Sequence, residues 1–156
     1  MKVFLSHSLA DKKLIQELKT NCTKQGLQLL IAEHVMDLQK SITQKIELMI
    51  QESAVALFLL TQKGDDSKFV HQEIGYAKSL KKPALYIVQK GKEVTGFAYG
   101  NDFIELDPEN PGIAITKAVN RLSRHWEKIN QIEDERKNAG IFIVGLIGLA
   151  LLANSK

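Results

Sequence analysis

The run Ala54–Leu60, AVALFLL, is the strongest indication of the fold, because it is seven residues long and contains no polar side chain. A strand of this composition is apolar on both faces, which is typical of the interior of a parallel sheet that helices cover on both sides. Apolar runs at Lys2–Ser6, Leu27–Ala32 and Ala84–Val88 predict further strands, and Phe103–Leu106 predicts a short strand at an edge.

Apolar residues recur at helical spacing in the segments between these strands. They mark three helices, over Leu14–Cys22, Ile42–Ile50 and Val70–Ala77. Strands that alternate with helices predict an α/β fold, a three-layer sandwich around a parallel sheet. In such sheets ligands bind beyond the carboxyl ends of the strands, where the strand order reverses, so we expect the functional residues there.

A long helix is expected to start at Asn110 and Pro111, since asparagine caps helices and proline fits the first turn. Its apolar residues are spaced four, three, four and three apart, which gives the helix a continuous seam. That seam either packs on the sheet or extends past it and pairs with a second copy. Its members are Ile115, Val119, Leu122, Trp126 and Ile129.

Residues 139–153, AGIFIVGLIGLALLA, contain no polar side chain. As a helix they would reach about 22 Å, slightly less than the roughly 30 Å hydrocarbon core of a bilayer. Arg136 and Lys137 precede the segment and would keep the globular part in the cytoplasm. The alternative is a hydrophobic helix buried in an oligomer or against its own domain. We therefore expect a domain over residues 1–137 and a hydrophobic segment over 138–156.

The composition excludes several classes of function. The 156 residues are 44% hydrophobic and 25% charged, as in one globular domain. A net charge of +3 without a clustered basic face argues against a nucleic-acid partner. The single cysteine, Cys22, excludes an intrachain disulfide, and the four histidines lack the spacing of metal ligands. We expect a cytoplasmic domain without a metal site.

Glu73 is the most informative ionisable residue. It lies in the third predicted helix, with Phe69 four residues before it and Tyr76 three residues after it, so the three side chains share a face. Desolvation between aromatic rings would favour the neutral carboxyl, and a ligand cation or hydroxyl would favour the charged one. Spacing alone leaves open the alternative of a surface glutamate beside the core.

Ser6, His7 and Ser8 follow the first strand and offer hydroxyls, an imidazole and backbone N–H groups. They form either an anion cradle or a simple helix cap. The chain has no GxGxxG turn, which a dinucleotide-binding Rossmann domain needs. It also lacks the acidic residues that a phosphate-accepting receiver domain carries at its strand ends.

Three stretches together resemble a Toll/interleukin-1 receptor (TIR) domain of the prokaryotic kind, over roughly residues 1–107. They are VFLSHS at 3–8, LLIAEHVMDLQKSITQKIELMIQESAVALFLLT at 29–61 and SKFVHQEIGYAKSL at 67–80. The resemblance implies a flavodoxin-like sheet of five parallel strands. It also implies an activity that many prokaryotic and plant members have, the cleavage of NAD+ between nicotinamide and ribose.

The resemblance assigns roles to individual residues. Glu73 occupies the position of the catalytic glutamate, and Ser6, His7, Ser8 and Phe69 would bind the substrate. The loop residues Met36, Asp37, Lys40 and Ser41 would contact a neighbouring copy and help to close its pocket. NAD+ would be the substrate, with no cofactor and no metal.

The implied function is an NAD+ glycohydrolase or ADP-ribosyl cyclase that is active as a homo-oligomer, in prokaryotic antiviral defence. A downstream effector would sense the ADP-ribose product. One alternative is a non-catalytic scaffold that recruits other TIR proteins through loop contacts, and another is a nucleoside deoxyribosyltransferase. The chain departs from many relatives in having Phe69 where they have tryptophan and Lys40 where they have glycine.

Overall fold

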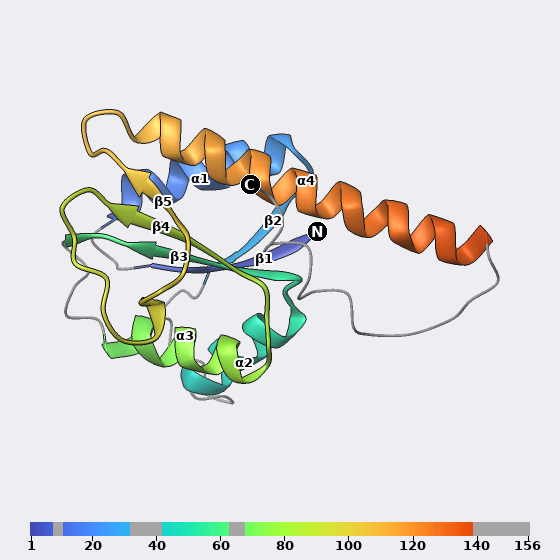
Figure 1. The fold of residues 1–156 in the computed structure, drawn as a ribbon, viewed down its shortest axis with the longest axis horizontal. Coiled ribbons are helices and arrows are strands. Elements are labelled where there is room, and N and C mark those ends of the chain that lie inside the picture. Colours follow the sequence, from blue (N-terminus) through green and yellow to red (C-terminus); the bar gives the residue numbers. More distant parts are fainter. Residues whose placement is uncertain (8–10, 32–41, 63–67, 139–156) are drawn as a thin grey trace.

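The structure is a computed structural model that describes residues 1–7, 11–31, 42–62 and 68–138 (Figure 1). Its centre is a five-stranded parallel sheet with the strand order β2-β1-β3-β4-β5. The predicted fifth strand is confirmed, and it lies at an edge as expected. The strands are β1 (Lys2–Ser6), β2 (Gln28–Ile31), β3 (Val55–Leu60), β4 (Ala84–Gln89) and β5 (Phe103–Leu106).

Helices cover both faces of the sheet, which confirms the predicted three-layer α/β fold (Figure 1). Helices α1 and α4 lie on one face, and α2 and α3 lie on the other. A short 3₁₀ helix, η3, packs against α3 and was not predicted, because three residues leave no periodic pattern. The bounds are α1 (Lys12–Lys24), α2 (Ile42–Glu52), α3 (Lys68–Ser79), η3 (Gly96–Ala98) and α4 (Pro111–Asn138).

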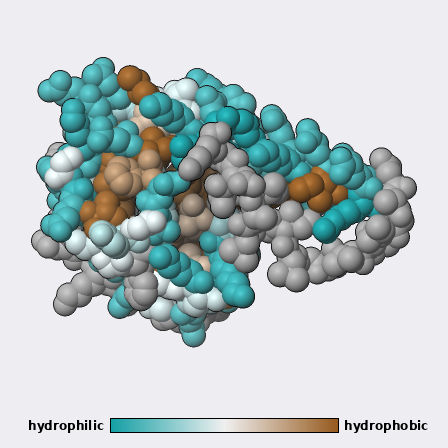
Figure 2. Space-filling model, viewed as in Figure 1, coloured by the Kyte–Doolittle hydropathy of each residue, from teal (hydrophilic) through white to brown (hydrophobic). Residues whose placement is uncertain are grey.

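The apolar run Ala54–Leu60 contains β3, the most buried strand of the sheet. Every residue of β3 is buried, because the sheet flanks it on both sides and helices cover both faces. The edge strands are more exposed to solvent. Most of β2 is half-buried, and β5 alternates exposed and buried residues, with Phe103 46% exposed. Figure 2 shows a band of apolar surface between the two hydrophilic helical layers. Burial therefore falls from the centre of the sheet to its edges.

The strand order reverses at β1. From β1 the chain passes to β2 on one side and then returns to β3 on the other side. Parallel strands end at a common edge, so the carboxyl ends of β1 and β3 flank the point at which ligands bind in this class of sheet. Ser6 is the last residue of β1, and Thr61 directly follows β3.

The seam of the long helix α4 packs on the sheet over its first half. Ile115, Val119 and Leu122 are buried in the core with the strands, and Trp126 packs partly against them. Beyond that point α4 continues past the sheet (Figure 1). No helix of the described residues is both long enough and apolar enough to span a bilayer. The hydrophobic segment expected over residues 139–153 lies outside the described residues.

Candidate active site

Helix α3 carries Glu73 within its core-facing stripe rather than beside it. Val70, Ile74 and Ala77 face the sheet and are buried, and Glu73 lies three residues after Val70 and four before Ala77. Residues at these spacings share one helix face. Glu73 is consequently only 8% exposed, so the reading of a surface glutamate does not apply.

Ser6 meets the Glu73 carboxyl from the end of β1. It is 1% exposed, and its Oγ donates a hydrogen bond to Oε2 of Glu73. Burial raises the pKa of Glu73 to about 7, although the hydrogen bond from Ser6 opposes this shift. The carboxyl therefore titrates near neutral pH, whereas an exposed glutamate would be fully ionised there.

Such a group has two chemical uses. In its ionised form it places a negative charge in a region of low dielectric, where it can stabilise positive charge that develops on a bound substrate. With a pKa near the working pH it can also accept or release a proton. The hydrogen bond from Ser6 to Oε2 helps to hold the carboxyl in one orientation.

The other predicted substrate-binding residues are placed only in part. His7 directly follows β1 beside Ser6 and is half-buried. Phe69 lies in α3, one turn before Glu73. Ser8 lies outside the described residues. The predicted assembly loop also lies outside them, with Met36, Asp37, Lys40 and Ser41.

A second buried carboxylate, which the sequence reasoning missed, lies at the same edge of the sheet. Asp11 precedes α1 and is 6% exposed, and its Oδ2 accepts a hydrogen bond of 2.8 Å from the Thr61 hydroxyl. This bond joins the start of α1 to the end of β3 at the reversal of strand order. The available signal was an acidic residue just before the apolar periodicity of a helix, where carboxylates are favoured.

Two further features lie apart from this site. A groove of about 280 Å³ runs between β5 and the first turns of α4, lined among others by Phe103, Asp107 and Lys117, and by none of the expected site residues. Within the described ranges, no three histidine, cysteine, aspartate or glutamate side chains come together as a metal ion would require. The Glu73–Ser6 pair is thus the centre of the candidate site.

Solved structures share the fold at low sequence identity. The CMP N-glycosidase BcmB of Clostridium botulinum is 18% identical, with a TM-score of 0.58, and the match covers 76% of this chain and 98% of that one. A prokaryotic SEFIR domain is 13% identical, with a TM-score of 0.56 and coverages of 76% and 96%. The structure of the RPS4 and RRS1 TIR domain heterodimer is 12% identical, with a TM-score of 0.60, and the match covers 80% of this chain and 97% of that one.

No curated protein matches the chain. The family described as "TIR domain" matches residues 3–95, which include β1 except for its first residue, the whole of α3 with Glu73, and the whole of β4. The matched region is more than half of the 156 residues. The chain therefore belongs to the TIR domain family.

Proposed function

We propose that the protein cleaves the bond between nicotinamide and ribose in NAD+. The observation that supports this proposal most directly is the buried carboxyl of Glu73, which is raised to a pKa of about 7 and held by Ser6 at the carboxyl edge of the sheet. The fold shared with a CMP N-glycosidase agrees with chemistry on an N-glycosidic bond of a nucleotide.

The reaction demands little beyond a well-placed negative charge. As the C–N bond breaks, its electron pair goes to the ring nitrogen of nicotinamide, which leaves as a neutral molecule. Positive charge then develops on the ribose, and the ionised Glu73 stabilises it as carboxylates do in glycoside cleavage. Water that adds to the ribose carbon and releases a proton gives ADP-ribose. Attack by a hydroxyl or a base nitrogen of the same molecule, with release of a proton, gives a cyclic product.

Assembly is part of the proposal. TIR domains pair in the RPS4–RRS1 heterodimer, which supports association between TIR domains here. We propose that several copies assemble through the loop around Met36–Ser41, and that a downstream effector senses the ADP-ribose product in prokaryotic antiviral defence. Residues 138–156 would anchor the cytoplasmic domain at the membrane. Confinement there would raise its local concentration and favour assembly.

The test is nicotinamide release from NAD+ by the full-length protein, in detergent and on liposomes. Glu73→Gln should lower kcat by about 10²–10⁴-fold, the range expected for a positioned charge or base. Glu127→Gln makes the same chemical change at an exposed position of α4 and should leave the rate unaltered. Since the ionised carboxyl is the active form, the wild-type rate should rise with pH through about 7. Equal rates for wild type and Glu73→Gln would refute the catalytic role.

CMP is the second substrate to test, because the structural relative BcmB is named for its cleavage. The non-catalytic scaffold is the second candidate function, and the TIR heterodimer favours it. Absence of turnover on both nucleotides under every assembling condition, together with capture of other TIR proteins, would support the scaffold.

The membrane anchor has its own test. The full-length protein should stay with membranes during carbonate extraction, and deletion of residues 138–156 should release it. Extraction of the full-length protein into the soluble fraction would contradict the anchor and leave the catalytic proposal untouched.

A further inference from the structure

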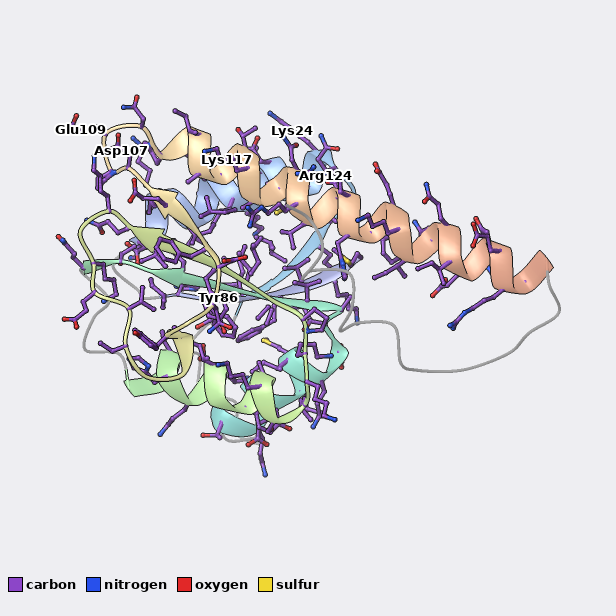
Figure 3. The ribbon with its side chains drawn as sticks, in the orientation of Figure 1. Lys24, Tyr86, Asp107, Glu109, Lys117 and Arg124 are labelled. Carbon is purple, nitrogen blue, oxygen red and sulfur yellow. The ribbon has the colours of Figure 1, made fainter. Side chains whose placement is uncertain are left out.

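The side of the sheet that carries Ser6 and Glu73 also buries a phenol, Tyr86 of β4. Ser6 pairs in register with Phe58 of β3, and Phe58 pairs with Tyr86. Residues in register on neighbouring parallel strands point to the same face. Two strand spacings place Tyr86 about 10 Å from Ser6 along this row. Tyr86 therefore stands in the same layer as the candidate site, between the sheet and α3 (Figure 3).

The ring of Tyr86 is fixed by its neighbour. It stacks on the ring of Phe58, with centroids 5.3 Å apart and planes inclined by 25°. Side chains on a strand stand roughly perpendicular to the sheet, so the hydroxyl projects toward the helical layer that holds Glu73. The stacked pair gives the phenol a defined direction and little freedom to turn away.

The hydroxyl of Tyr86 is unusual because it is buried without a hydrogen-bond partner among the described residues. Tyr86 is 3% exposed, and burial raises its pKa, so the phenol remains a protonated donor at neutral pH. A buried donor without an acceptor lowers stability. Phenylalanine, which the chain uses at neighbouring Phe58, would avoid that loss. The other tyrosine on this side, Tyr76, has its hydroxyl 2.7 Å from Nε2 of Gln51.

We propose that Tyr86 is a further substrate-binding residue of the Glu73 site, whose hydroxyl donates a hydrogen bond to an oxygen of the bound nucleotide. The proposal rests on the proposed cleavage of a nucleotide at that site. The proposal explains why a tyrosine lies in an apolar layer, because the bound nucleotide would supply the hydrogen-bond acceptor for its hydroxyl. A site that loses such a donor discriminates less well in favour of substrates that carry the acceptor oxygen.

The experiment compares full-length Tyr86→Phe with wild type on liposomes, in nicotinamide release and in urea unfolding. The KM for NAD+ should rise about tenfold, the size expected for one lost hydrogen bond. The urea midpoint should stay the same or increase, because the variant no longer buries an unpartnered donor. Tyr99→Phe changes an exposed tyrosine and should leave KM unaltered. Tyr76→Phe serves for stability alone and should lower the midpoint, because its hydroxyl has a partner.

The outcomes separate this proposal from the proposed function. An unchanged KM in Tyr86→Phe, or a lowered urea midpoint that reveals an internal partner, overturns the role of Tyr86 while cleavage stands. If wild type releases no nicotinamide, thermal stabilisation by NAD+ or CMP replaces KM as the readout. If a nucleotide stabilises wild type but not Tyr86→Phe, the result supports nucleotide binding by Tyr86 even though the protein does not cleave NAD+. No stabilisation of wild type by either nucleotide overturns both proposals.

Discussion

The two faces of the sheet bury different kinds of side chain. The face under α1 and α4 is almost entirely aliphatic, with leucine, isoleucine, valine and alanine packed around β3. The face under α2 and α3 instead contains the rings of Phe4, Phe58 and Tyr86, and beside them Ser6 and Glu73. The first face has an aliphatic core whose buried polar groups, Asp11, Thr61 and His125, lie outside its apolar cluster, while the second brings Ser6 and Glu73 next to a layer of aromatic rings.

The contrast between the faces predicts which substitutions change stability and which change the proposed turnover. Burial of aliphatic side chains contributes roughly 25 cal/mol per Å² of apolar surface, whereas a buried carboxyl or an unpartnered hydroxyl lowers stability. Substitutions on the aliphatic face should therefore reduce stability and spare turnover. Substitutions of the polar groups on the other face should do the reverse.

The largest stability effect is expected from Leu122→Ala on α4. Leu122 is 1% exposed in the aliphatic core, so its truncation leaves a cavity and should lower the free energy of unfolding by about 3 kcal/mol. Urea unfolding measures this loss, and nicotinamide release per folded molecule should stay at the wild-type level. A large loss of kcat in folded Leu122→Ala would break the division between the faces.

Glu73→Gln should have the opposite effect: it should abolish turnover and increase stability, and the gain in stability should depend on pH. The pKa of Glu73 is about 7 in the folded protein, above the ordinary value of 4.5, so the folded state keeps the proton to higher pH than the unfolded chain does. Wild-type stability therefore falls as pH rises from about 4.5 to 7, by about 3 kcal/mol as an upper value. The glutamine variant escapes this loss.

Urea unfolding at pH 4, 6 and 8 checks this expectation. The variant should match wild type at pH 4 and become more stable than wild type as pH increases, while its turnover is lost. A difference in stability that is the same at all three values would show that the carboxyl is not desolvated in solution.

The smallest effect concerns His125, a polar exception on the α4 side. It is 3% exposed, and neither ring nitrogen has a hydrogen-bond partner within the described part of the chain. Burial, and secondarily the charge of Lys128, lower its pKa. As pH falls, the unfolded chain therefore binds a proton at His125 before the folded protein does. The stability that comes from keeping His125 neutral is present above its usual pKa and is lost in acid.

His125→Leu should stabilise the protein by about 1 kcal/mol at pH 7, since two unpartnered polar atoms are removed. The gain should grow between pH 7 and pH 5, which urea unfolding at both values would reveal. Equal or lower stability of the variant at pH 5 would indicate that the imidazole has an acceptor. Turnover at pH 7 should be unchanged, because His125 lies on the opposite face from Glu73.

Much of the fold was predictable because it depends on local pattern. The run Ala54–Leu60 predicted the central strand, and the structure shows β3 buried on both faces. The edge position of Phe103–Leu106 followed from its shortness, and the start of α4 followed from Pro111. Periodicity reports which residues face the core, and in this chain most elements obey it.

The site was less predictable because it depends on contacts between distant residues. The sequence drew attention to Glu73 and Ser6 separately, but their hydrogen bond joins residues 67 positions apart. Asp11 and Thr61 are 50 positions apart, and no local pattern pairs them. The missing acceptor of Tyr86 was likewise invisible, since a tyrosine in an apolar strand resembles any other core aromatic. Such features need the register of the sheet.

The direction of α4 has a consequence for access to the protein. At 28 residues it extends about 42 Å, and it runs opposite to the strands, so its last turns emerge at the pole that holds their amino ends (Figure 1). Glu73 and Ser6 belong to the other pole. If the proposed anchor held the chain beyond α4, the edge of the sheet with Ser6 and Glu73 would face away from the membrane, and α4 would act as a spacer.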